Sequence, residues 1–165
     1  MAGEVFSGKL IRVRVDEQGL ELVSHPPAVV MVAVDERGRV WLVRSPRPVP
    51  ERTLIEVPAG LVEPEESPDA AARRELLEEC GVEAGRWEKL ASAYSSPGFS
   101  DERIHVYLAT ELREVSSDPS TLEIEERVQA SLDEALVLCS GNLQSLAALL
   151  LARRRLAVAR PEHPG

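Results

Sequence analysis

Short β-rich runs of apolar residues recur along the chain, and many of them are separated by Gly or Pro. Such runs, several with alternating polar and apolar positions, are typical of strands. We therefore expect strands at Lys9–Val15, Val29–Val34, Val40–Val43, Arg52–Val57, Trp87–Tyr94 and Arg103–Ala109. Tight turns are expected at Asp16–Gly19 and Asp35–Gly38, because Gly tolerates the positive φ that hairpin turns need.

The clearest helical signal lies in the middle of the chain. Ser67 is a good N-cap, Pro68 suits the first helical position, and Asp69 lies near the positive end of the helix dipole. Gly81 suits the position after a helix, so the helix is expected to begin after Ser67 and to stop at Gly81. Two further helices are expected, at Leu132–Leu138 and Leu143–Leu156.

Length and composition fit one compact domain, residues 1–165, with 44% apolar residues. The longest apolar stretches fall far short of the roughly 20 residues that cross a bilayer, so no membrane span is expected. Residues 1–9 lack the basic and apolar segments of a secretory signal, which favours a cytoplasmic protein. Cys80 and Cys139 lie far apart in the sequence and are expected to be buried free thiols.

The net charge of −9 opposes binding to nucleic acid, and the basic runs are short. An anionic substrate would also be repelled unless cations bridged it to the protein. A divalent metal ion is therefore an attractive cofactor before any motif is considered.

Three glutamates, Glu75, Glu78 and Glu79, share one narrow arc of the expected central helix, because they are three and four residues apart. Their mutual repulsion destabilises an isolated helix by roughly a few tenths of a kcal/mol per pair. A hard cation such as Mg²⁺ would reverse this penalty, since it binds carboxylates together with substrate phosphates. Taken alone, such a cluster is more often a solvated acidic face.

The residues around the cluster follow a longer pattern. From Gly60 to Val82 the chain reads GLVEPEESPDAAARRELLEECGV. This segment resembles the Nudix box, G-x5-E-x7-R-E-U-x-E-E-x-G-U with U aliphatic, at every specified position. The resemblance implies an α/β/α sandwich with a mixed β-sheet. Residues 26–158 would form its core, residues 1–25 an N-terminal strand extension and residues 160–165 a tail.

The same resemblance implies roles for individual residues. Glu75 and Glu79 would be the principal metal ligands, with Glu66 and Glu78 assisting and the backbone carbonyl of Ala59 a further candidate. Arg74 would orient these carboxylates through a salt bridge, although its alternative is an ordinary surface ion pair worth at most about 1 kcal/mol. The metal would be Mg²⁺, with Mn²⁺ as an alternative.

Segments outside the box resemble the ADP-ribose pyrophosphatase subfamily. Leu42–Arg47 resembles its L-V-x-Q-Y-R pattern, with Ser-Pro in place of Gln-Tyr, and Glu56–Gly60 resembles its E-L-P-A-G. Pro97 follows Val82 by 15 residues, near the distance found in the subfamily. The likeness implies hydrolysis of ADP-ribose to AMP and ribose 5-phosphate.

Candidate substrate contacts follow from guanidinium chemistry and from the subfamily loop. Arginine can bind phosphate through two hydrogen bonds or stack on a purine. Solvated arginines at strand ends are an equally good interpretation of the same residues. The loop by itself has the composition of a surface turn, and its last glutamate would reach the terminal ribose or a second metal. The candidates are Arg44, Arg47, Arg52, Pro97, Gly98 and Glu102.

A carboxylate must also accept a proton from the attacking water. The subfamily resemblance implies a glutamate from a late loop, with Glu123 the first choice and Glu126 the second. Solvated loop charge is the alternative for either residue.

Related enzymes are commonly homodimers, so the strands at about Val5–Val23 are expected to pack against a partner subunit.

Two alternatives to ADP-ribose hydrolysis stay open. One is cleavage of another nucleoside diphosphate derivative, such as a nucleotide sugar or a dinucleoside polyphosphate. The other is a Nudix-fold sensor that binds a nucleotide without cleaving it, although the complete set of box glutamates favours an enzyme.

Overall fold

The computed structural model describes residues 2–115 and 124–158. The strands are β1 (Gly3–Ser7), β2 (Arg12–Val15), β3 (Glu21–Ser24), β4 (Ala28–Ala33), β5 (Arg39–Arg47), β6 (Arg52–Glu56), β7 (Ala59–Leu61), β8 (Val82–Tyr94), β9 (Arg103–Glu114) and β10 (Glu126–Ser131). The helices are α1 (Pro68–Cys80), α2 (Leu132–Leu138) and α3 (Leu143–Val158). The sheets have the orders β1-β2-β3, β10-β5-β6 and β7-β4-β9-β8.

β4 lies inside the mixed four-stranded sheet, and all six of its residues are buried. A strand covered on both faces requires consecutive apolar residues, which the sequence AVVMVA supplies. β4 runs parallel to β9 and antiparallel to β7. Its first residue, Ala28, pairs with Leu61 on one side and Ile104 on the other. The chain therefore leaves β7 and enters β9 at the same end of the sheet.

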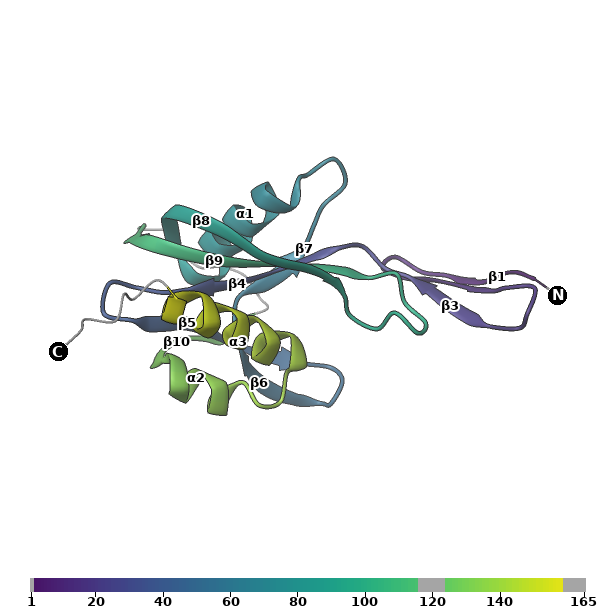
Figure 1. Cartoon of the computed structure of the whole chain (residues 1–165). Helices are drawn as coiled ribbons and strands as arrows, with labels where there is room; N and C mark the ends of the chain where they lie inside the picture. Colours follow the sequence, from purple (N-terminus) through teal and green to yellow (C-terminus); the bar gives the residue numbers. More distant parts are fainter. Residues whose placement is uncertain (1, 116–123, 159–165) are drawn as a thin grey trace.

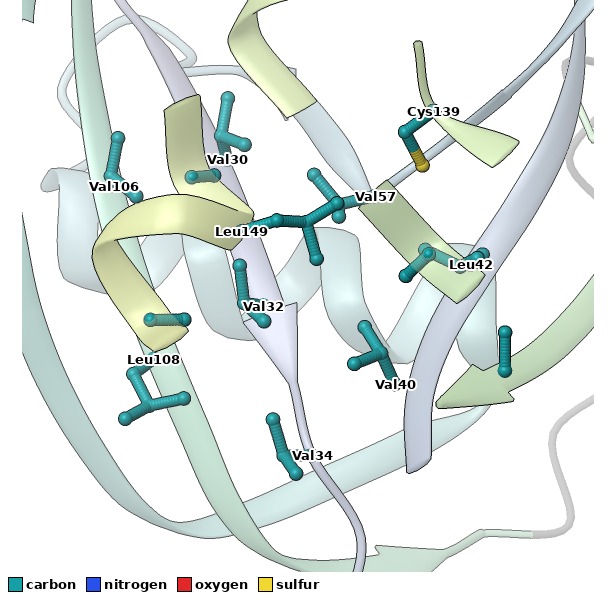
Figure 2. Close-up of a cluster of buried hydrophobic side chains, with 14 of the residues drawn as sticks. Val30, Val32, Val34, Val40, Leu42, Val57, Val106, Leu108, Cys139 and Leu149 are labelled. Carbon is teal, nitrogen blue, oxygen red and sulfur yellow. The ribbon is translucent and has the colours of Figure 1, made fainter. Parts of the chain in front are cut away.

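Two hydrophobic clusters lie on opposite faces of β4. Val30 packs with Leu149 of α3 in one cluster (Figure 2). Val29 and Met31 belong to the other, together with Leu76 of α1. Because side chains alternate between the two faces of a strand, one short strand joins both helical layers (Figure 1). This layering confirms the expected α/β/α sandwich with a mixed sheet.

The N-terminal sheet projects away from the α/β/α core (Figure 1). It meets the core where β3 bridges the loop before β9, and the amide of Val23 donates to the carbonyl of Phe99 at 2.7 Å. On this sheet Val5 and Phe6 are 63% and 52% exposed. The projecting sheet confirms the expected N-terminal strand extension.

The helices begin and end close to their predicted positions. Ser67 Oγ accepts a hydrogen bond from the amide of Ala70 at 3.2 Å, and Gly81 follows α1 in the left-handed region at φ 65°. α2 has its predicted bounds, while α3 continues two residues beyond Leu156. The predicted tail at 160–165 lies outside the described residues.

The hydrophobic pattern did not predict β7 or β10. β7 has three residues, and Gly60 at its centre contributes no side chain. β10 reads ERVQAS, which has few apolar positions. Both are strands because β4 and β5 offer them backbone hydrogen-bond partners. β8 and β9 are longer than predicted because their more polar ends pair with each other, as Glu83 does with Arg113.

Cys80 and Cys139 are buried and free, as expected. Burial raises the pKa of both thiols, that of Cys139 to about 12, so neither is a thiolate at neutral pH. Among the described residues, no helix combines the length and apolar character that crossing a membrane requires.

Candidate active site

Arg74 lies at the centre of the acidic cluster on α1. Its guanidinium donates to Glu66 at 2.9 and 3.0 Å, to Glu75 at 2.7 Å and to Glu78 at 3.2 Å. It also donates to the backbone carbonyl of Leu61 at 3.0 Å. The side chain is only 26% exposed. Arg74 therefore ties the loop before α1 to two turns of the helix, which a single surface ion pair would not do.

Glu75 lies directly against the backbone of β7. A Cβ atom at Gly60 would overlap the carboxyl group of Glu75. Gly60 is not among the glycines with positive φ, so the site requires its missing side chain and not its backbone freedom. This close approach brings the carboxylate of Glu75 beside the segment that carries the carbonyl of Ala59.

Glu79 joins α1 to the same segment. Its side chain is nearly buried, and Oε2 accepts a hydrogen bond from the amide of Ala59 at 2.9 Å. A buried carboxylate is costly unless it is hydrogen-bonded, and this bond meets part of that requirement. Leu76 and Cys80 are fully buried in the core. α1 thus packs one face on the core and directs the adjacent arc toward β7.

The charges in the cluster are unbalanced. The pKa of Glu66 is lowered, chiefly because Arg74 donates hydrogen bonds to its charged form. Hydrogen bonds to Glu66 and Glu75 raise the pKa of Arg74, so Glu66 and Arg74 are both charged at neutral pH. One guanidinium faces three carboxylates, and the excess negative charge suits a divalent cation.

The donor set is made of hard oxygen atoms, which fits Mg²⁺ or Mn²⁺. Within the described ranges, no three Asp, Glu, His or Cys side chains converge as a finished set of metal ligands. A metal held here would therefore need further ligands from water or substrate, as Mg²⁺ commonly does.

The three candidate arginines have different surroundings. Arg47 is bound to Glu56, with Nη2 and Oε2 2.6 Å apart. Arg44 pairs with Glu126 at 2.9 Å, and both side chains are more than a third exposed. Arg52 lies beside the turn between α2 and α3. The structure therefore brings Arg44 next to one late-loop candidate and gives Arg47 a buried carboxylate partner. Glu123 lies outside the described residues.

The loop at residues 95–102 lies at the end of the sheet where the box loop also begins. Pro97 lines a cavity of about 260 Å³ together with Arg14 and residues of β3. Glu102 lies 3.4 Å from His25 Nδ1, and Gly98 has open space around it. Pro97 therefore faces the N-terminal sheet, and Glu102 lies beside the link between β3 and β4, so that sheet contributes to the same region.

A buried network that the sequence did not predict supports the segment leading into β7. Glu56 is 2% exposed and accepts a hydrogen bond from Asn142 Nδ2 at 2.5 Å. The amide of Val57 donates to Ser145 Oγ at 3.2 Å. Glu56 lies in a segment with a recognisable pattern, but Asn142, just before α3, and Ser145 of α3 lie in no motif, so only the tertiary fold reveals them.

We predict that Gly60→Ala disables the acidic cluster without unfolding the protein, because the added methyl group displaces the carboxylate of Glu75. The dissociation constant for Mn²⁺, measured by electron paramagnetic resonance, should rise at least about tenfold. Gly38→Ala is the matched control, since Gly38 has φ 75° but open space around it. It should lose stability through backbone strain and keep its affinity for Mn²⁺. Equal affinities in the two variants would contradict the prediction.

Known proteins resemble this chain along most of its length. The family model of the NUDIX domain matches residues 24–149. An ADP-ribose pyrophosphatase of Bacillus subtilis (strain 168) is 40% identical over 153 residues, covering 84% of this chain and 80% of the relative. A methanol dehydrogenase activator of Bacillus methanolicus is 36% identical over 143 residues, covering 81% and 77%. An ADP-ribose pyrophosphatase of Mycobacterium tuberculosis is 43% identical over 117 residues, covering 68% and 56%.

The fold also has a solved counterpart. A crystal structure of an ADP compounds hydrolase aligns with a TM-score of 0.78 over 96% of this chain and 93% of that chain, at 22% sequence identity. That likeness shows the fold. Nudix hydrolases generally use divalent metal ions, which agrees with the hard oxygen donors gathered around Arg74. With the family match and a complete box on α1, the chain belongs to the Nudix hydrolase family.

Proposed function

We propose that the protein hydrolyses the diphosphate bond of ADP-ribose to AMP and ribose 5-phosphate, with Mg²⁺ as its metal and Mn²⁺ able to replace it. The observation that carries this proposal is the intact carboxylate cluster around Arg74 and Gly60. It occurs in a chain 40% identical to an ADP-ribose pyrophosphatase over most of both lengths.

Glu75 and Glu79 are the proposed principal ligands, assisted by Glu66, Glu78 and the carbonyl of Ala59. When bound, a divalent metal neutralises the charge of a diphosphate and lowers the pKa of a bound water. Arg74 holds three of the four carboxylates in one place, which reduces the reorganisation needed when the substrate arrives. In the reaction, a water oxygen attacks one phosphorus, a bridging P–O bond breaks, and a carboxylate accepts the water's proton.

Substrate contacts are proposed on two sides of this cluster. Arg44 is exposed enough to exchange Glu126 for a phosphate oxygen, and Arg52 is a second candidate. Arg47 would bind the substrate only by sharing or giving up its bond to Glu56. The loop containing Pro97, Gly98 and Glu102 would contact the rest of the substrate; the cavity against the N-terminal sheet supports this part of the proposal. The arginines can supply bidentate contacts to phosphate, and the carboxylate of Glu102 can accept hydrogen bonds from ribose hydroxyls.

A second substrate class has a specific observation in its favour. GDP-mannose pyrophosphatases of three bacteria are 35% to 46% identical to parts of the chain, but the matches cover half of it or less. ADP-ribose is therefore preferred and GDP-mannose is the first competitor. A sensor that binds without cleaving would not need all four glutamates.

The direct test is release of AMP from ADP-ribose in the presence of Mg²⁺, resolved by chromatography. The wild-type protein should cleave it and lose activity with chelator, and Glu79→Gln should lower kcat by more than about 100-fold, since even indirect ligand support is worth about 10- to 100-fold. Glu36→Gln, in an exposed turn, is the matched control. Binding of ADP-ribose without cleavage would support the sensor. Faster turnover of GDP-mannose than of ADP-ribose would make GDP-mannose the preferred substrate.

The proton acceptor is proposed to be Glu123, with Glu126 second because Arg44 already engages it. Glu123→Gln should lower kcat by about 100-fold or more, the range of a general base, with the KM for ADP-ribose changed little. Glu126→Gln should lower kcat by less than about tenfold. Glu125→Gln serves as the control from the same segment. The reverse ranking would make Glu126 the base.

We also propose a cytoplasmic homodimer joined through the N-terminal sheet. Val5, Phe6, Leu10 and Leu20 are large apolar side chains left about half exposed on or beside this sheet, as expected for an interaction surface. The two reduced, buried thiols agree with a reducing compartment.

Sedimentation velocity should show a dimer for the wild-type protein, and Phe6→Glu should shift it to the monomer because the added charge would be buried in the interface. Val137→Glu alters an apolar residue on α2 that is more exposed than Phe6, at 72%, and should stay dimeric. A wild-type monomer at micromolar concentration would refute the dimer.

A further inference from the structure

The acidic helix α1 has an unfavourable C-terminal end. The partial negative charge of a helix C-terminus favours basic residues there, yet the last turn of α1 has none. Instead it carries Glu78 and Glu79, with Glu75 one turn earlier. A positive charge at the last turn of α1 must therefore come from another part of the chain.

Arg127 of β10 supplies that charge from a distant part of the chain. Its Nε donates to the backbone carbonyl of Glu79 at 3.1 Å. Its guanidinium atoms lie 2.7 to 3.0 Å from the position that a Cβ on Gly81 would take. Gly81 is thus needed for its φ of 65° and also for the space that Arg127 occupies. The pairing of Arg127 with Val43 explains its direction, since Val43 belongs to the cluster beneath α1.

The guanidinium atoms of Arg127 differ in how well their hydrogen-bonding needs are met. Its Nη2 is buried and has no hydrogen-bond partner within the described part of the chain. A buried donor left unsatisfied lowers the stability of the folded state, so this atom by itself does not favour arginine over a smaller residue. The Nε bond and the helix-end charge are the terms that favour arginine here.

The contact fixes one end of Glu79 while the opposite end is already held. The carboxylate of Glu79 accepts from Ala59, and its carbonyl accepts from Arg127. Arg127 also follows Glu126 directly, at the point where the late segment enters β10. One side chain therefore links the helix that carries the acidic cluster to the strand that follows the late loop.

We propose that Arg127 is a positioning residue for the metal site: it sets the depth and orientation of Glu79 without touching substrate. This inference rests on the proposed metal-dependent function, but not on the identity of the substrate. It assigns to Arg127 an effect on metal affinity and on kcat, with little effect on the KM for ADP-ribose.

The test compares Arg127→Gln and Arg127→Lys with Arg153→Gln, which alters an exposed arginine of α3 that pairs with Asp133. Electron paramagnetic resonance of Mn²⁺, without substrate, should show the dissociation constant rising about tenfold in Arg127→Gln, the size of effect found for groups that support metal ligands. Arg127→Lys keeps the charge at the helix end and should recover most of the affinity. Arg153→Gln should match the wild-type protein.

Three further readouts separate positioning from a loss of folding. Thermal unfolding must show all variants folded at the assay temperature, and amide hydrogen exchange should quicken in residues 77–81 of Arg127→Gln. With ADP-ribose, kcat should fall about tenfold while KM stays within about twofold. A lower melting temperature with unchanged Mn²⁺ affinity and kcat would overturn the proposal and leave a purely structural role.

Failure of the substrate assignment gives a different result. If the wild-type protein binds Mn²⁺ but leaves ADP-ribose intact, the proposed substrate falls while the affinity comparison still decides the role of Arg127. If the wild-type protein binds no Mn²⁺, the positioning role and the metal site are refuted together.

Discussion

Mutual repulsion among the carboxylates of α1 is the constraint on which the site depends. Glu75, Glu78 and Glu79 lie on one arc near a helix end that disfavours negative charge. Arg74 counters part of this repulsion from within the helix by contacting Glu75 and Glu78, and it also pairs with Glu66 of the preceding loop. Because one positive charge cannot neutralise three negative ones, the fold keeps a cation-binding potential that a neutral cluster would lack.

The rest of the structure holds α1 rigidly enough to sustain that arrangement. Ala71, Ala72, Leu76 and Cys80 are fully buried, so the helix cannot rotate to spread its glutamates without exposing apolar surface. β4 offers apolar residues to α1 on one face and to α3 on the other. Because β4 packs tightly against both helical layers, a displacement of one layer would disturb the packing of the other.

Patterns that depend on local chemistry were readable from the sequence. Capping residues, helix periodicity and the spacing of the box located α1 and its acidic arc, and continuous apolar residues located β4. β7 was missed because its identity as a strand comes from its partner and not from its three residues. The same holds for Arg127 and Asn142, whose roles arise from contacts across 48 and 86 residues of sequence. The spacing of residues along the chain does not predict such long-range contacts.

The short segment from Glu56 to Gly60 shows how these distant contacts control local geometry. At its start, Glu56 is held by Arg47 and by Asn142 at the beginning of α3. At its end, the amide of Ala59 bonds to Glu79 and Gly60 makes room for Glu75. A buried carboxylate is stable only while its donors remain in place, so the position of the segment depends on α3 and on α1 together. The precision of the acidic cluster is therefore a property of both helical layers, although all its principal carboxylates come from one loop and one helix.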